Sequence, residues 1–528
     1  MDELNSSGNL SGKLPRELPG ELLGKRIAVI GAGISGIAVA RILQAAGHDI
    51  VMYEKSHEVG GIWATTYPRV SLQNTRKHYF FSDFNYPEQP DLHPTGAQIE
   101  RYLNDAITHF SLTVKFNHEV TNSEFVNGLW QLTIACAGEE EIQAFDFVIV
   151  ATGQYNAEKP DDEFPGREKY PGNVITEIDV DDLSVFDNKQ VAVVGFGKSA
   201  VDMAVFATEQ GASVSHIFRT ARWLLPFKLF GVHYSLLLFN RASTTMMTSW
   251  AQASGAANFM HKHLGFIPKA FWAGITGILK LRLKRLAKKA GSGAGERLTC
   301  VTPTHDLLPD LRSALALAPI NYYEYIASNE ISPYHAELAA FNEQGLVLKD
   351  GTTIPCDTVV LSTGSKKPVY RFLPDKYRVL LESEDDGTQL YRHLVHPGIP
   401  ALAFAGLNHG FMHVPSAEVG ALWLCALLDG QLDLPSEAEQ LATIESIREW
   451  KRENIHFEPS RSCAVNTRFQ QYNDIILKDL GMSPYRKMPN VFAEVFAGYG
   501  AGDYTGMVEE FLTSREQRGK RRPSEATT

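Results

Sequence analysis

Apolar residues follow the same order in two parts of the chain: a short run, a glycine-rich turn, then helical spacing. The first part reads "IAVIGAGISGIAVARILQAAG" from residue 27, and the second reads "VAVVGFGKSAVDMAVFATEQG" from residue 191. The short apolar run predicts a buried parallel strand, and apolar residues three and four apart predict the helix after it. A further apolar run follows each helix, "HDIVMYE" and "ASVSHIF". The pattern therefore predicts an α/β chain with two strand–turn–helix–strand units.

The first glycine-rich turn has the spacing of a dinucleotide-binding site. Gly31, Gly33 and Gly36 stand in the order GxGxxG between the predicted strand and helix. The first glycine permits the tight bend, the second lets a pyrophosphate approach the backbone, and the third lets helix and strand pack closely. The helix N-terminus offers free N–H groups to the phosphates. Glu54 ends the next strand, 23 residues after Gly31, where a carboxylate accepts hydrogen bonds from a ribose diol.

The second turn, "GFGKSA" from residue 195, has the same frame with two differences. Ala200 occupies the third glycine position, which the close helix packing tolerates. Phe218 stands 23 residues after Gly195 in place of an acid, and Arg219 and Arg222 follow it. A carboxylate repels a 2′-phosphate whereas guanidinium groups bind one, so this site is predicted to take NADPH rather than NADH. Ordinary surface charge is the alternative explanation for the two arginines.

The residues after the first unit, "EVGGIWATTYP", suit a bulky cofactor. Gly60 and Gly61 let the backbone come close to a ligand, and Trp63 supplies an aromatic wall. We therefore expect FAD at the first site. Two nucleotide sites in one chain then predict hydride transfer from NADPH to FAD.

Composition narrows the class of protein. The chain has 528 residues, 44% of them hydrophobic, which is enough for two or three domains with sizeable cores. Its five cysteines are scattered with no CxxC pair, which indicates a reducing compartment and no disulfide scaffold. A net charge of -11 gives no general attraction to nucleic acid. We expect a cytoplasmic protein.

Several motifs together resemble those of the class B flavoprotein monooxygenases, the flavin-containing monooxygenases in particular. They are the two glycine motifs, "GGIW", "LQNTRKHYFFSDFNYP", "FVIVATGQYN", "FPGREKYPGNVITEID" and "VVLSTG". The match runs from about Arg26 to about Pro484, and "FAGLNHGFMHVPSAEVGALWLCALLDG" is similar to fungal members that tailor secondary metabolites. The resemblance implies an NADPH- and O2-dependent enzyme that forms a flavin hydroperoxide and oxygenates a nucleophilic nitrogen or sulfur, or an activated carbon, of an apolar small molecule.

Asn74 is the candidate catalytic residue, because it matches the family asparagine that supports the oxygen intermediate. Its amide can donate a hydrogen bond without offering an acidic proton. A cap of the next helix is the structural alternative, and it applies equally to Gln73 and Thr75. Baeyer–Villiger oxygenation of a ketone, which usually needs an arginine, and a flavin-binding redox scaffold without turnover are the alternative functions. Thr176 stands where the family fingerprint has histidine, which puts the usual coupling of NADPH binding to flavin geometry in doubt.

The motifs and the resemblance divide the chain into segments and give two sets of cofactor-binding residues. The expected segments are a tail (1–23), a first FAD part (24–160), an NADPH domain (161–367) with a helical insertion (223–300), a second FAD part (368–514) and a polar tail (515–528). The candidate residues for FAD are Gly31, Gly33, Ser35, Gly36, Glu54, Lys55, Gly61, Ile62, Trp63, Asn74, Thr75 and Val120. Those for NADPH are Gly195, Gly197, Ser199, Ala200, Arg219 and Arg222.

The insertion ends in a basic amphipathic stretch, "FWAGITGILKLRLKRLAKKAG". On a helix, one stripe consists of Trp272, Ile275, Leu279, Leu283 and Leu286, with lysines and arginines on the rest. The stripe is expected to pack on its own domain as a lid over the substrate channel. The alternative is that residues 271–289 lie on a membrane, at the cytosolic face of the endoplasmic reticulum. We expect no metal site, because the histidines at 261–263 and 409–413 lack ligand spacing, although His409 and His413 could line the flavin pocket.

Overall fold

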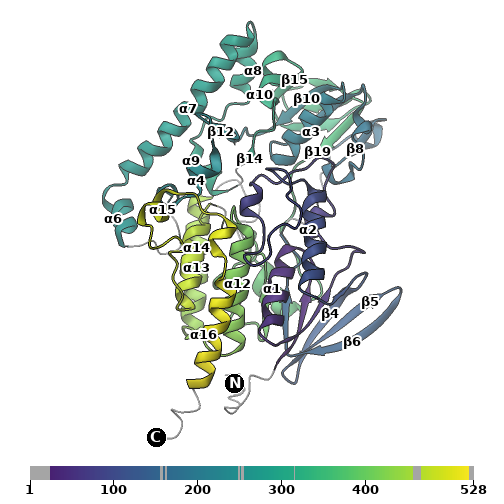
Figure 1. Cartoon of the computed structure of the whole chain (residues 1–528). Coiled ribbons are helices and arrows are strands. Elements are labelled where there is room, and N and C mark those ends of the chain that lie inside the picture. Colours follow the sequence, from purple (N-terminus) through teal and green to yellow (C-terminus); the bar gives the residue numbers. More distant parts are fainter. Residues whose placement is uncertain are drawn as a thin grey trace, which may run out of the picture.

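The computed structural model describes residues 24–521 except 155–158, 161–162, 248–249, 251–254, 314–315, 456–464 and 466. Two five-stranded parallel sheets organise the molecule (Figure 1). The strand order in the first is β20 (Leu402–Phe404), β7 (Phe147–Val150), β1 (Arg26–Ile30), β2 (Asp49–Tyr53) and β3 (Val114–Lys115). The order in the second is β15 (Ile331–His335), β10 (Ser213–Phe218), β9 (Gln190–Val194), β19 (Thr358–Leu361) and β8 (Asn173–Ile175). The predicted α/β class with two Rossmann-like folds is confirmed.

Each glycine-rich turn connects a central strand to a helix. β1 leads into α1 (Ile34–Ala45), and β9 leads into α3 (Lys198–Glu209). Ten of the twelve residues of α1 are buried, because the helix packs on the first sheet and on α12 (His413–Leu428). β20 pairs with β7 in parallel, so the chain returns to the first sheet after it has formed the second.

Two antiparallel meanders were not predicted. The first consists of β4 (Glu119–Val126), β5 (Leu129–Cys136) and β6 (Glu139–Phe145), and the second of β16 (Leu338–Phe341), β17 (Gly345–Leu348) and β18 (Thr353–Pro355). Asn127 and Gly128 join β4 to β5 with φ angles of 51° and 84°. This is the Asn-Gly hairpin turn, whose signal is present in the sequence.

The insertion is mainly helical and contacts both the domain of the first sheet and the domain of the second sheet. Its elements are β11 (Leu224–Leu225), β12 (Lys228–Leu229), β13 (Val232–His233), α4 (Tyr234–Leu238), α5 (Arg241–Thr245), α6 (Gly255–His263), α7 (Phe266–Ala290) and α8 (Ala294–Cys300). The apolar stripe of α7 faces inward, with Trp272, Leu279 and Leu283 buried against α8, α9 (Leu307–Arg312) and α10 (Tyr322–Ser328). β14 (Ala316–Leu317) pairs with β11 just after the insertion.

The remaining helices cover the first sheet and form the C-terminal part (Figure 1). They are α2 (Gly96–His109), α11 (Asp375–Glu382), α12, α13 (Glu437–Asn454), α14 (Phe469–Asp479), α15 (Val491–Phe496) and α16 (Met507–Arg521). Ser436 caps α13, with a reciprocal bond to Glu439. α12 begins at His413.

The C-terminal boundary needs a correction, because residues 515–521 belong to α16 rather than to a polar tail. Arg515 is buried, and its guanidinium pairs with Asp429 and donates to the Ala46 carbonyl oxygen. These buried partners hold the last helix against α12 and the end of α1. Residues 1–23 and 522–528 lie outside the described part.

Candidate functional site

The first glycine-rich turn has no room for side chains at two of its three glycines. A Cβ on Gly31, whose φ is +109°, would lie 2.5 Å from the Ala151 carbonyl oxygen. A Cβ on Gly36 would lie 2.1 Å from the Gly31 carbonyl oxygen, and one on Gly33 would meet only the Cα of Gly61, at 3.7 Å. No side chain caps the N-terminus of α1, and its first turn holds no acidic residue. This N-terminus is therefore suited to an anionic group.

The residues predicted to hold the rest of FAD gather around this turn. The buried Glu54 carboxylate accepts hydrogen bonds from the backbone N–H of Ala32 at 2.8 Å and of Ser56 at 3.0 Å. Lys55 beside it is exposed. The buried Val120 follows residues 117–118, whose backbone N–H groups donate to the carbonyl oxygens of Ser56 and Glu54, just after β2. Gly61, Ile62 and Trp63 form a 3-10 turn, η1 (Gly61–Trp63), with Gly61 against Gly33.

The second turn repeats the geometry with one open position. A Cβ on Gly195, whose φ is +129°, would lie 2.2 Å from the Ser362 carbonyl oxygen, whereas a Cβ on Gly197 would meet nothing within 4 Å. Ala200 is buried and packs against Gly195. The Gly195 carbonyl accepts a hydrogen bond from His216 Nε2 at 2.7 Å. Burial lowers the pKa of His216 to about 4, so this ring is a neutral structural support.

The arginines predicted to bind the 2′-phosphate follow β10. Arg219 is exposed, and Arg222 is half-buried in the neighbourhood of the Asp310 carboxylate. Phe218 occupies the position of the absent acid and stacks on His335, with ring centroids 5.5 Å apart. Ser199, also a candidate, is half-buried in the first turn of α3. The structure thus brings the candidate NADPH residues to one edge of the second sheet.

Asn74 lies where the loop after η1 meets the insertion and the start of α12. Its side chain is buried, its Nδ2 donates to the Phe411 carbonyl oxygen, and its Oδ1 is 3.1 Å from the Tyr234 hydroxyl. The capping alternative is wrong for Asn74, because the next helical turn, η2 (Arg76–His78), has Thr75 at its N-cap. Thr75 instead contacts His78, with 2.9 Å between its Oγ1 and the imidazole Nδ1.

Aromatic side chains from separate elements close around Asn74. Phe239 is at the centre of the group, with its ring 5.0 Å from His78, 5.4 Å from Phe411, 5.5 Å from Phe469 and 5.8 Å from Tyr234. Four of these five side chains are buried and Phe411 is partly so. This surrounding excludes water from the asparagine amide.

His409, which precedes α12, and His413, its first residue, are half-buried. His413 Nε2 is 3.0 Å from the Ser35 hydroxyl in α1, and burial lowers the pKa of His413 to about 4 and that of His409 to about 3. Among the described residues no group of three or more His, Cys, Asp or Glu side chains could hold a metal ion. Thr176 is half-buried and is the N-cap of a short turn, where its hydroxyl donates to the Asp179 carboxylate at 2.8 Å.

Buried polar atoms without a hydrogen-bond partner lie beside both glycine-rich turns, which indicates that these turns bind ligands. Among the described residues, His413 Nδ1 beside the first turn and the Ser362 hydroxyl beside the second are buried without a hydrogen-bond partner. Both helix N-termini lack side-chain caps, and the glycines leave the backbone bare. The donor set therefore fits two dinucleotides: FAD at α1 and NADPH at α3.

The sequence comparisons decide the family. The description "FMO-like: Flavin-binding monooxygenase-like" matches residues 24–265. "Probable flavin-containing monooxygenase 1" of Arabidopsis thaliana is 30% identical over an alignment of 526 positions that covers 91% of this chain and 96% of that protein. The chain belongs to the flavin-binding monooxygenase-like family. It is an FAD-dependent monooxygenase with NADPH as its electron donor.

Solved structures support the fold of this monooxygenase. The open structure of cyclohexanone monooxygenase has a TM-score of 0.66 at 17% identity, covering 86% of this chain and 97% of its own. S-allyl-L-cysteine S-oxygenase from Allium sativum has a TM-score of 0.59 at 17% identity, covering 93% and 99%. At these identities the likeness concerns the fold alone.

Different parts of the monooxygenase would bind the cofactors and protect the oxygen chemistry from water. Bound FAD supplies hydride acceptance and oxygen activation. The N-termini of α1 and α3 would hold the two pyrophosphates, the arginines after β10 would lie near the second nucleotide, and the aromatic group around Asn74 would keep water away. The asparagine amide offers a neutral N–H donor in this dry surrounding, where one hydrogen bond is worth more than in water.

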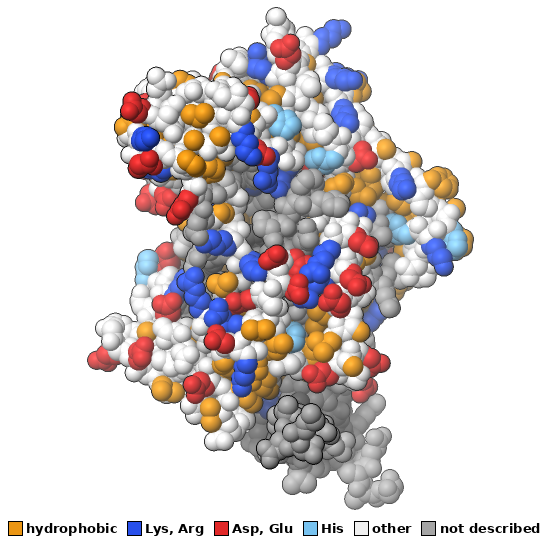
Figure 2. All heavy atoms as spheres, turned by 180° about the vertical axis from the view of Figure 1, so that it is seen from behind, with side chains coloured by type: hydrophobic (Ala, Val, Ile, Leu, Met, Phe, Trp, Pro, Cys, Tyr) orange, Lys and Arg blue, Asp and Glu red, His pale blue; other side chains and the backbone are white. Residues whose placement is uncertain are grey.

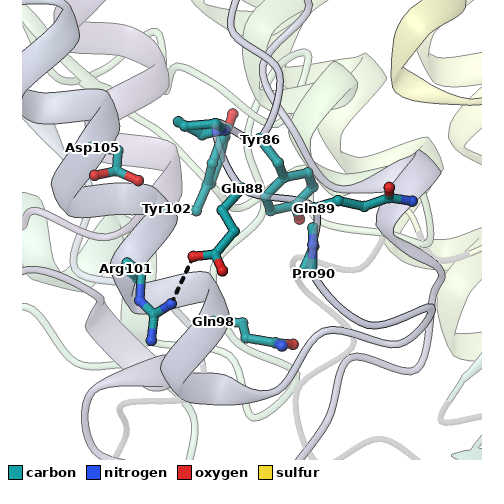
Figure 3. A pocket seen from close by; sticks show the side chains of 9 residues that line it. Tyr86, Glu88, Gln89, Pro90, Gln98, Arg101, Tyr102 and Asp105 are labelled. Carbon is teal, nitrogen blue, oxygen red and sulfur yellow. Dashed lines mark hydrogen bonds and ion pairs between the residues drawn. The ribbon is translucent and has the colours of Figure 1, made fainter.

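A small surface pocket lies away from this chemistry (Figure 3). It is formed between residues 86–90 and α2, with an ion pair of 3.1 Å between Arg101 and Glu88 at its edge. None of the predicted site residues line it. We assign no part of the monooxygenase reaction to this pocket.

Proposed function

We propose that the enzyme oxygenates a nucleophilic nitrogen or sulfur of an apolar small molecule, with Asn74 as the residue that handles oxygen. The observation that carries the proposal is the environment of its amide. The side-chain partners of Asn74 are a phenol and a backbone carbonyl, so the site offers a neutral donor. Oxygen insertion next to a ketone calls for an arginine that stabilises an anion, which is why we favour heteroatom oxygenation over the Baeyer–Villiger reaction.

Replacing Asn74 tests the proposal. Asn74→Asp adds a negative charge beside the oxygen site and removes the donor, a loss of about 3 kcal/mol or 10²-fold in rate. FAD content and anaerobic bleaching of the flavin by NADPH should be unchanged, because the nucleotide turns are elsewhere. In air, NADPH should be consumed with release of hydrogen peroxide and little product.

The control and the substrate test use the same preparation. Asn104→Asp makes the same chemical change on the exposed face of α2 and should leave the product yield intact. The enzyme is then incubated with a panel of thioethers, amines and ketones, and the masses of the products are measured. This distinguishes heteroatom oxygenation from Baeyer–Villiger oxygenation. Product from ketones alone would contradict the proposal, and so would an unchanged product yield in Asn74→Asp.

The aromatic group also supports an apolar substrate, since a polar one would lose its hydration on entering without gaining partners. The fungal secondary-metabolite role is a further proposal, supported by the resemblance of residues 404–430 alone. Product masses from a panel of bulky apolar amines and thioethers would test it together with the substrate class.

We further propose that the enzyme is cytosolic and makes peripheral contact with the endoplasmic reticulum membrane, at a different place from residues 271–289. No single helix among the described residues has the length and hydropathy to cross a membrane; α6 and α7 reach that length and composition only when taken together, and they meet at a bend of 84°. The stripe of α7 faces the protein: Trp272, Leu279 and Leu283 are buried, and Ile275 and Leu286 are half-buried. Exposed apolar side chains are found instead on α6, at the start of α7 and on α15. They are Phe259, Phe266, Ile267, Val491, Phe492 and Phe496.

α6 and α15 lie next to each other on one side of the molecule (Figure 1). His261 of α6 bonds to the Thr245 carbonyl at the end of α5, and α15 packs on the same helix α5. Figure 2, seen from behind, shows hydrophobic, histidine and Lys or Arg side chains together on the projection at the right. Phe259→Ser with Phe492→Ser should reduce co-sedimentation with phosphatidylcholine–phosphatidylserine vesicles. Ile142→Ser, at a side chain 69% exposed on β6, is the control, and equal sedimentation of all variants would refute the proposal.

A further inference from the structure

The segment of the insertion that begins α4 contacts the Asn74 loop directly. Tyr234 is fully buried, and its hydroxyl donates to the Gln73 carbonyl oxygen at 2.7 Å and lies 3.1 Å from Asn74 Oδ1. The Phe411 carbonyl accepts from Nδ2 at the other end of the same amide. The single phenol proton is shared between the Gln73 carbonyl and Asn74 Oδ1, and the Phe411 carbonyl accepts from Nδ2, so these two partners together determine which end of the amide is which.

Two histidines hold this segment in place. His93 Nδ1 is 3.1 Å from the Leu72 carbonyl oxygen and 3.0 Å from that of Asn74, so Nδ1 carries a proton and Nε2 accepts. His233 accepts at Nδ1 from the Ser235 backbone N–H, so its proton is on Nε2. The two Nε2 atoms are 3.2 Å apart, and only these tautomers make a hydrogen bond between them.

The histidine bridge is a contact between neutral rings. Burial lowers the pKa of His93 and of His233, and the charged or titratable groups that face the pair are Lys198, Lys228 and His78. The bridge therefore joins the insertion to the backbone carbonyl of Asn74 at neutral pH. The residue beside it in sequence, Tyr234, reaches the Asn74 side chain from the same anchored turn.

We propose that Tyr234 is a positioning residue for the oxygen chemistry: it holds the Asn74 amide with its oxygen toward the insertion and its N–H groups toward the reacting centre. This rests on the role proposed above for Asn74. Without the phenol, the amide can rotate and present its oxygen, which cannot donate. The insertion would then be part of the oxygen-handling site as well as a cover over it.

The test uses the complete FAD-containing enzyme and needs no substrate. Hydrogen peroxide released in air is measured with NADPH alone, beside anaerobic bleaching of the flavin absorbance. Tyr234→Phe removes one hydroxyl and should raise peroxide release about fivefold, the effect of one neutral hydrogen bond. FAD content and the anaerobic bleaching rate should not change. Tyr102→Phe is the matched control, since its buried hydroxyl bonds only to the backbone of residues 81 and 84 and should leave peroxide release unaltered.

A double-variant cycle separates positioning from a general structural effect. If Tyr234 acts through Asn74, Tyr234→Phe should add nothing to the peroxide release of Asn74→Ala. Additive effects, loss of FAD from Tyr234→Phe, or a peroxide rate equal to that of the unaltered enzyme would overturn the inference. If Asn74→Ala itself releases no extra peroxide, the proposed role of Asn74 fails instead, so the two failures are distinguishable.

Discussion

Gly197→Ala is the substitution that separates ligand binding from folding most cleanly. Gly197 precedes α3 with φ -77° and ψ 179°, which any residue adopts, and a Cβ there would meet no heavy atom within 4 Å. The folded protein thus has no reason to require glycine. The dinucleotide does, because the second glycine of such a turn is where the pyrophosphate approaches the backbone.

The size of the effect follows from what the methyl group displaces. Losing one charge-assisted hydrogen bond from the backbone to a phosphate costs about 1.5–3 kcal/mol, and each 1.4 kcal/mol is about tenfold. We therefore expect the KM for NADPH to rise by about 10- to 100-fold. The free energy of unfolding should change by less than about 1 kcal/mol, since the site is open and the backbone unstrained.

The assay is steady-state NADPH oxidation together with a thermal melt of each variant. Gly295→Ala is the control in the same domain, because its Cβ also meets nothing within 4 Å and it lies in α8. Gly195→Ala should instead lower the melting temperature, since its Cβ would lie 2.2 Å from a carbonyl oxygen. An unchanged KM in Gly197→Ala would refute the placement of the pyrophosphate at this turn.

Three further outcomes are expected. Arg219→Ala should raise the KM for NADPH but not that for NADH, since only NADPH carries the 2′-phosphate; equal effects on both would exclude the assignment. Arg41→Met should cost about 3–5 kcal/mol in urea unfolding, because it leaves the buried Glu418 charge without its partner. The pKa values of His216 and His413 are about 4 against 6.5 unfolded, so stability is complete above pH 6.5 and falls as pH drops toward 4, by up to about 3 kcal/mol for each. Melts between pH 7.5 and 5 measure the last effect.

The nucleotide-binding folds could be predicted because their signals are local in the sequence. Glycine spacing, the end of the following strand and the capping box at Ser436 are each set by residues a few positions apart. Their structural consequences depend on backbone geometry that any tertiary context must respect. The Asn127–Gly128 pair is a local signal of the same kind. It indicates a hairpin, so the pairing of β4 with β5 could also have been predicted.

Contacts between distant segments could not be predicted. Tyr234 and Asn74 are 160 residues apart, and nothing in the spacing of either indicates the other. The stripe of α7 could equally face lipid or protein, because amphipathicity reports that one face is apolar and not what covers it. The structure resolves this by burying Trp272 and Leu283 and leaving Phe266 exposed.

At the third position of the glycine motif, the sequence does not show whether a side chain fits. The motif accepts either glycine or alanine there. In the first turn a Cβ on Gly36 would lie 2.1 Å from a backbone carbonyl oxygen, whereas the second turn already holds the Ala200 Cβ. Gly36→Ala must therefore move the turn, and we expect the enzyme to be purified with little FAD and a lowered melting temperature. Ala200→Gly removes a methyl group from a turn that tolerates both residues and should cost about 1 kcal/mol with NADPH binding retained. If Gly36→Ala kept its full flavin content, the first turn would be as adaptable as the second, and the steric distinction between them would be wrong.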